Sequence, residues 1–165
     1  MPRTRRSHEE GHRRKFLVVV DDTPECDRAV YYAARRAART AGGLVMLATF
    51  ELDEAGGQWL GVADLMRAEA TDHATARLGH YAARARALSG IEAEVVVREG
   101  VLAAAIAHQV ETDEDIGILV LASSAAGEGA GPLVHGLLSG NLAAFPIPVT
   151  IVPGMLTDAE IDALA

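Results

Sequence analysis

The chain has 165 residues, half of them apolar, and carries a formal net charge of −8 at pH 7. That length suits one domain with a sizeable core, and the acidic balance disfavours binding to nucleic acid or to anionic lipid. No stretch is long and apolar enough to span a bilayer. The one cysteine, Cys26, cannot form a disulfide within the chain, which is compatible with a cytoplasmic location.

The basic residues gather at the start of the chain. Six of the fifteen lie in the first fifteen positions beside two acidic residues, which leaves nine basic and twenty-one acidic residues from Phe16 onward. We expect residues 1–14 to form a disordered, solvated basic tail. Residues 13–15, RRK, resemble a twin-arginine export signal, but the apolar run Phe16–Val20 that follows is too short for export.

Apolar runs and turn residues predict an alternation of strands and helices. The predicted strands are 16–20, 44–50, 91–97, 118–121 and 149–152. Thr23 and Pro24 are typical of the N-cap and first position of a helix, which ends at residues 42–43, GG. A long helical region follows from about Trp59 to Leu88, and a third helix covers 101–110.

The segment 116–152 has the pattern of a buried strand, a glycine-rich loop, a helix and a second strand. The run Ile118–Leu121 is apolar without alternation, as in a parallel sheet covered on both faces. The loop contains Gly127, and Pro132 begins the helix, which we expect to stop at Phe145. A strand that leads through glycines to a helix N-terminus is a phosphate-binding geometry.

Five strands interleaved with four helices predict an α/β domain with a single doubly wound five-stranded parallel sheet and helices on both faces. We place this domain at residues 15–153. Ligands of such folds bind outside the carboxyl ends of the strands. This rule brings Asp21, Asp22 and the loop Ala122–Gly131 around one crevice. Residues 154–165 form a C-terminal tail, in which Thr157 and Glu160 predict a capping box for a short helix.

Four stretches of sequence, in this order, resemble the universal stress protein (UspA) family. They are VVVDDTPECDRAVYYAARRA from Val18, VREG from Val97, DIGILVLASS from Asp115 and FPIPVTIVP from Phe145. The resemblance covers roughly Lys15 to Val152. It implies a strand order of 3-2-1-4-5, subunits that commonly dimerise through the last strand, and members that bind ATP.

The resemblance is incomplete at the family's ATP signature, which is glycine, two residues, glycine, nine residues, glycine, then serine or threonine. Aligned without a gap, the four positions fall on Ala122, Ala125, His135 and Gly136, and none matches. A register five residues further on places Gly127, Ala130, Gly140 and Asn141 there instead, and stays open as an alternative. Asp21 matches the first-strand aspartate that contacts the nucleoside in the family.

The candidate residues of the crevice combine carboxylates, hydroxyls and loop glycines. They are Asp21, Asp22, Thr23, Ser123, Ser124, Gly127, His135 and Gly136. Each also has a purely structural interpretation. Acidic residues at a helix start stabilise its dipole, serines after a strand form turns, and a histidine on such a helix is commonly exposed.

Other protein classes with related folds lack their defining residues here. A response-regulator receiver needs a lysine after its fifth strand, whereas the only lysine of the chain is Lys15. No nucleophile–base pair and no metal-ligand cluster stands out, so we predict no enzyme, no metal and no required cofactor.

We therefore expect a stress-response or regulatory protein that acts through homodimerisation and contact with an unidentified protein partner, without the family's ATP mode. The alternative is a member that binds ATP or AMP and senses or slowly hydrolyses ATP. The expected dimer contact is the uncharged edge strand Val149–Val152, because an open apolar edge needs a partner. The competing arrangement has the tail 154–165 folded over that edge.

Overall fold

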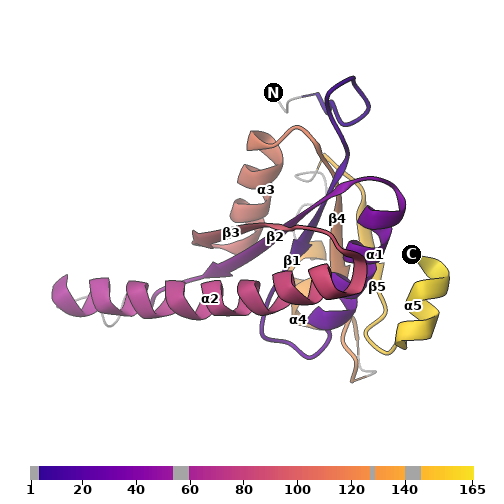
Figure 1. Ribbon diagram of the computed structural model, residues 1–165. Coiled ribbons are helices and arrows are strands. Elements are labelled where there is room, and N and C mark those ends of the chain that lie inside the picture. The colour runs from indigo at the N-terminus through magenta and orange to yellow at the C-terminus, as the bar shows by residue number, and fades with distance from the viewer. Residues whose placement is uncertain (1–3, 54–59, 127–128, 140–145) are drawn as a thin grey trace.

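A computed structural model describes residues 4–53, 60–126, 129–139 and 146–165, and contains one parallel sheet. The five strands lie in the order β3-β2-β1-β4-β5 (Figure 1), which confirms the expected fold and strand order. The strands are β1 (Lys15–Val19), β2 (Gly43–Phe50), β3 (Glu94–Glu99), β4 (Ile116–Ala122) and β5 (Val149–Val152). The helices are α1 (Cys26–Arg39), α2 (Leu60–Ser89), α3 (Leu102–Thr112), α4 (Pro132–Leu138) and α5 (Asp158–Leu164).

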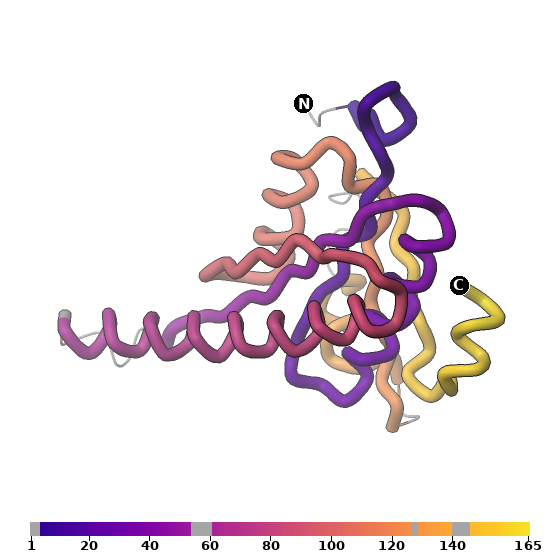
Figure 2. Tube along the Cα trace, viewed as in Figure 1, coloured from indigo at the N-terminus to yellow at the C-terminus, as the bar shows by residue number. Residues whose placement is uncertain are grey.

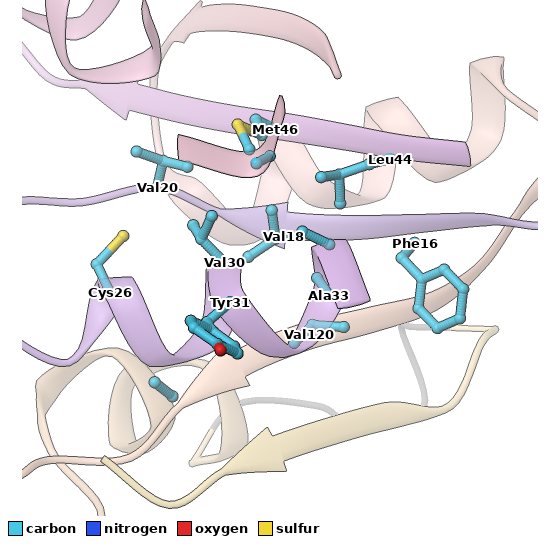
Figure 3. Packing of buried hydrophobic residues seen from close by; sticks show 14 of the residues in the cluster. Phe16, Val18, Val20, Cys26, Val30, Tyr31, Ala33, Leu44, Met46 and Val120 are labelled. Atoms are coloured by element: carbon cyan, nitrogen blue, oxygen red, sulfur yellow. The ribbon is translucent and has the colours of Figure 1, made fainter. Parts of the chain in front are cut away.

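The central strand β1 separates two apolar cores. Because side chains alternate along a strand, Phe16 and Val18 face a cluster that includes residues of α1, α2 and α5 (Figure 3). Leu17 and Val19 face the other way, toward residues of α3 and α4. Helices therefore cover both faces, and this explains why β1 is apolar from Phe16 onward.

The third strand begins later than the sequence predicts. It starts at Glu94 rather than Ile91, and Val95 is 51% exposed, as befits an edge strand. The preceding helix α2 extends well past the sheet (Figure 2), and an ion pair of 2.7 Å between Arg67 and Glu99 joins it to β3. The predicted end of the fourth helix at Phe145 lies outside the described residues.

The sequence predicts a disordered basic tail at residues 1–14, whereas residues 4–14 make hydrogen bonds with the rest of the chain. Arg5 donates from Nη1 to the carbonyls of Val110 and Asp113 over 2.6 and 3.0 Å. The backbone N–H of Arg6 donates to the carbonyl of Glu114. These contacts join the segment to the turn between α3 and β4, more than one hundred residues away.

The C-terminal residues form the predicted capped helix, with Thr157 and Glu160 in a capping box. Helix α5 packs against α1 rather than over the edge of β5. Asp162 accepts hydrogen bonds from the Tyr31 hydroxyl and forms an ion pair with Arg35 at 2.8 Å. The neighbouring Ile161 is fully buried. The competing arrangement with a covered edge is therefore not the one observed.

Among the described residues, no helix is both long and apolar enough to cross a membrane. No group of three or more His, Cys, Asp or Glu side chains among them is placed to hold a metal ion.

Candidate functional site

The carboxyl end of β1 leads into a short turn stabilised by Asp21. Its Oδ1 accepts hydrogen bonds from the backbone N–H and the hydroxyl of Thr23, over 3.1 and 2.6 Å. Thr23 therefore does not cap α1, which begins at Cys26 with Glu25 as its N-cap residue. The capping prediction is wrong because α1 begins at Cys26 rather than at Pro24, so Thr23 lies outside the cap position. Asp22, next in the chain, is exposed.

Glu25 is a residue of this region that the sequence analysis missed. It is the only buried charged residue among those described, with 7% of its surface exposed. Its side chain lies beside Gly154, where an added Cβ would stand 3.1 Å from the Glu25 Cβ. An acidic residue just after a proline at a helix start is a recognisable signal, because the helix dipole stabilises a carboxylate there.

The loop after β4 uses its serines to hold the chain together. The N–H of Ser123 donates to the carbonyl of Val152 over 2.9 Å, and its hydroxyl accepts from the N–H of Gly154 over 3.4 Å. The N–H of Ser124 donates to Ala130, and its hydroxyl accepts from Ala126, each over 3.2 Å. Both serines thus act as turn formers.

Gly131 ends this loop and lies close to the backbone of Ser124. Its φ of +86° is a left-handed conformation that favours glycine. A Cβ at this position would stand 3.0 Å from the backbone nitrogen of Ser124. Pro132 then opens α4 as predicted. Gly127 lies outside the described residues.

The remaining candidates lie on α4, where His135 and Gly136 are exposed. Gly136 lines a cavity of about 230 Å³ together with residues of α3 and the end of β2, among them Leu102 and Glu51. Neither Asp21 nor either serine lines this cavity, and His135 does not. The predicted crevice residues therefore lie in two separate places. Asp21 and the serines lie at the carboxyl ends of β1 and β4, and Gly136 lines the cavity between α3 and α4.

A thiol lies directly under the β1 turn. Cys26 is 3% exposed, with Sγ 3.9 Å from the carbonyl oxygen of Val19 (Figure 3). Burial raises the pKa of the Cys26 thiol to about 11. Burial also raises the pKa of Tyr81, which shares a hydrogen bond with the thiol. The thiol stays protonated at neutral pH, so it is a poor nucleophile and serves as a packed core residue.

Three acidic residues follow the end of β1. Asp21, Asp22 and Glu25 follow one another within five residues. Three or four phosphate charges beside them would be repelled. The loop N–H groups of Ser124 and Ala126, which are the type of donor that holds a phosphate, are already bonded within the loop.

Comparisons with known proteins agree with the architecture. The model of the universal stress protein family matches residues 12–153. A structure of the universal stress protein UspA from Lactobacillus plantarum is similar, with a TM-score of 0.67, 19% identity, and coverage of 84% of this chain and 97% of that one. No curated protein sequence matches the chain.

Two similar structures contain nucleotides. A universal stress protein in complex with cAMP has a TM-score of 0.62 and 17% identity, over 86% of this chain and 97% of that chain. A family protein from Arabidopsis thaliana with AMP bound has a TM-score of 0.56 and 14% identity, over 85% of this chain and 91% of that chain. At these identities the likeness shows the fold alone.

Proposed function

The chain belongs to the universal stress protein family, and we propose that it works without catalysis, as a homodimer joined through β5 that acts by contact with another protein. We also propose that the protein is cytoplasmic, as expected from the sequence, and that it does not bind ATP in the family's mode. The observation that carries it is the open apolar edge of the sheet.

That edge is uncovered among the described residues. Strand β5 pairs only with β4, and Ile151 is 39% exposed. A groove of about 240 Å³ runs beside the strand, lined in part by Ile151, Leu156 and Leu164. Leu164 and Met155 are themselves 62% and 72% exposed. An uncharged strand with free N–H groups and apolar surroundings is suited to pairing with a second copy.

The case against the ATP mode rests on the loop after β4. In the ungapped alignment, Ala122 and Ala125 stand where the family has its first two glycines, and neither has the positive φ that favours glycine. Ala122 is instead the last residue of β4, paired with Val152 and 2% exposed. The alternative register from Gly127 has three of its four positions outside the described residues, so it keeps the rival function open.

The second candidate function is adenine-nucleotide binding, as a sensor or slow ATPase. Two observations favour it: Asp21 ends the first strand where the family contacts the nucleoside, and similar proteins were solved with cAMP and with AMP. In this chain the Asp21 carboxylate already accepts two hydrogen bonds from Thr23.

The nucleotide content of the purified protein separates the two candidates. Acid extraction followed by chromatography is expected to release far less than one nucleotide per chain. A stoichiometric yield of ATP or AMP from protein with the natural sequence, and none from an Asp21→Ala variant, would establish the second candidate and overturn the first.

A further inference from the structure

We infer that the amino-terminal segment builds a second ligand site, a pocket for small phosphate-bearing anions at the amino ends of β1 and β4. A cavity of about 310 Å³ lies there, and its polar lining comes from Ser7, His8, His12, Arg13, Arg14 and Thr40. In Figure 1 this segment lies at the end of the sheet where β1 begins, opposite the carboxyl ends. The pocket is therefore separate from the crevice described above.

Glycines place the arginines of this pocket. The carbonyl of Arg14 accepts from the N–H of Gly43 over 2.9 Å, and a Cβ at Gly42 would stand 2.6 Å from that carbonyl oxygen. A Cβ at Gly117 would stand 3.2 Å from both Cγ and Cδ of Arg14. Side chains at these positions would displace Arg14, so the glycines fix its backbone and its stem.

The two guanidinium groups lack carboxylate partners among the described residues. Most arginines elsewhere are paired, as Arg6 is with Glu9 and Arg28 with Asp27. No such ion pair joins Arg13 or Arg14 to the rest of the described chain. The Arg14 guanidinium carbon lies 5.8 Å from the centre of the Phe16 ring. Its Nε is buried without a hydrogen-bond partner, which is costly unless an acceptor arrives.

The other polar groups that line the pocket are a histidine and two hydroxyls. His12 holds Nδ1 2.6 Å from Oδ1 of Asp115, so its Nε2 donates to an anion only when the imidazole is protonated. The Thr40 hydroxyl already donates to the carbonyl of Arg36 over 2.8 Å, so it offers only an acceptor. The Ser7 hydroxyl has no partner among the described residues. None of the residues that line the pocket is acidic, although acidic residues outnumber basic ones in the chain.

Phosphate is the chemistry that fits these groups. Guanidinium groups match phosphate oxygens through parallel, charge-assisted hydrogen bonds. A volume of about 310 Å³ is near the lower end of ligand pockets, which leaves room for a small organic group on the phosphate. The structure thus points to either free phosphate or the phosphate of a small soluble metabolite.

The test is an amide NMR titration of the full chain at low ionic strength, with inorganic phosphate in one arm and ribose 5-phosphate in the other. We expect saturable shifts at residues 7–14 and 40–42, with the loop 123–131 unchanged. Tighter binding of ribose 5-phosphate would assign the site to a phosphorylated metabolite, and equal binding would assign it to phosphate itself.

Variants separate this site from general attraction between opposite charges. The double variant Arg13→Gln/Arg14→Gln is expected to weaken binding about tenfold or more. The control Arg77→Gln removes an arginine of α2 that has no ion pair among the described residues, and is expected to change affinity by less than about twofold. If the double variant is unfolded, Arg13→Gln alone replaces it, because that side chain is exposed. Equal weakening by both changes, absence of saturation, or shifts confined to 123–131 would overturn the inference.

Discussion

The backbone N–H of Gly154 donates to the Ser123 hydroxyl across 3.4 Å, which joins the chain beyond β5 to the chain beyond β4. A Cβ at position 154 would overlap the Ser123 carbonyl oxygen and stand 2.9 Å from the Ala125 nitrogen. Because both neighbours are backbone atoms, they cannot rotate away. We expect Gly154→Ala to lower the free energy of unfolding by about 1–3 kcal/mol, measured by urea denaturation.

Gly136 supplies the matched control for this glycine. An added Cβ there meets nothing within 4 Å, and the residue is exposed on α4. Gly136→Ala is expected to raise the free energy of unfolding by about 0.5–1 kcal/mol, since alanine favours the helix. Similar effects of the two substitutions would show that the contact of Gly154 with Ser123 does not limit stability.

The fold could be predicted from the sequence because the apolar composition of a strand indicates on how many faces it is buried. The unbroken apolar runs of β1 and β4 identify strands covered on both faces, and the structure places helices on both sides of them. The capping box of Thr157 and Glu160 was equally visible, since it depends on residues three apart. Both patterns depend on near neighbours in the sequence, and both were predicted correctly.

The errors concern contacts between distant parts of the chain. We predicted a solvated tail at residues 4–14 because their hydrogen-bond partners lie far away in the sequence, next to the turn before β4. No pattern within the segment itself indicates such contacts. For Ser123 and Ser124 the sequence left the ligand and turn interpretations open, because their partners at Gly154 and Ala130 could not be predicted from it. The prediction that Thr23 caps α1 was also wrong, because the helix begins at Cys26.

ATP affinity is the second testable quantity. We expect magnesium and ATP to bind weakly or without saturation by titration calorimetry at low salt, because the acidic residues after β1 repel phosphate and the loop N–H groups are already bonded. A dissociation constant below about 1 μM that is lost in Asp21→Ala would contradict this expectation.

A restored signature supplies the complementary experiment for ATP. If the ungapped alignment is correct, the combined changes Ala122→Gly, Ala125→Gly, His135→Gly and Gly136→Ser are expected to increase ATP affinity. Position 136 has space for the serine, whereas Ala122 lies within β4, so the folded state of the variant is checked by circular dichroism. A folded variant without added affinity would refute the ungapped alignment.

The buried thiol predicts a loss of stability in alkali. The folded pKa of Cys26 is raised to about 11, above the unfolded value of roughly 8.5–9. A raised folded pKa means that the stabilisation is complete below the unfolded pKa and is lost as the pH rises toward 11. Between pH 9 and pH 10 this group is expected to lower the free energy of unfolding by about 1 kcal/mol.

The control for the thiol is Cys26→Ala, compared with the natural chain by urea denaturation at each pH. Alanine creates a small cavity at every pH, so the variant starts less stable, but its stability curve lacks the contribution of the thiol. Parallel curves between pH 9 and pH 10 would show that Cys26 ionises equally easily in the folded and unfolded chains.

The dimer through β5 is the last prediction. Ile151→Lys places a charge in the middle of the free edge, where Ile151 is 39% exposed, so burial against a second copy becomes unfavourable. Sedimentation is expected to give twice the chain mass for the natural protein and the single chain mass for this variant.

Val95→Lys is the matched control, because Val95 is also β-branched and exposed but lies on the opposite edge strand β3. We expect it to stay dimeric. A well-folded Ile151→Lys variant that remains a dimer, or a Val95→Lys variant that alone dissociates, would place the contact elsewhere on the molecule.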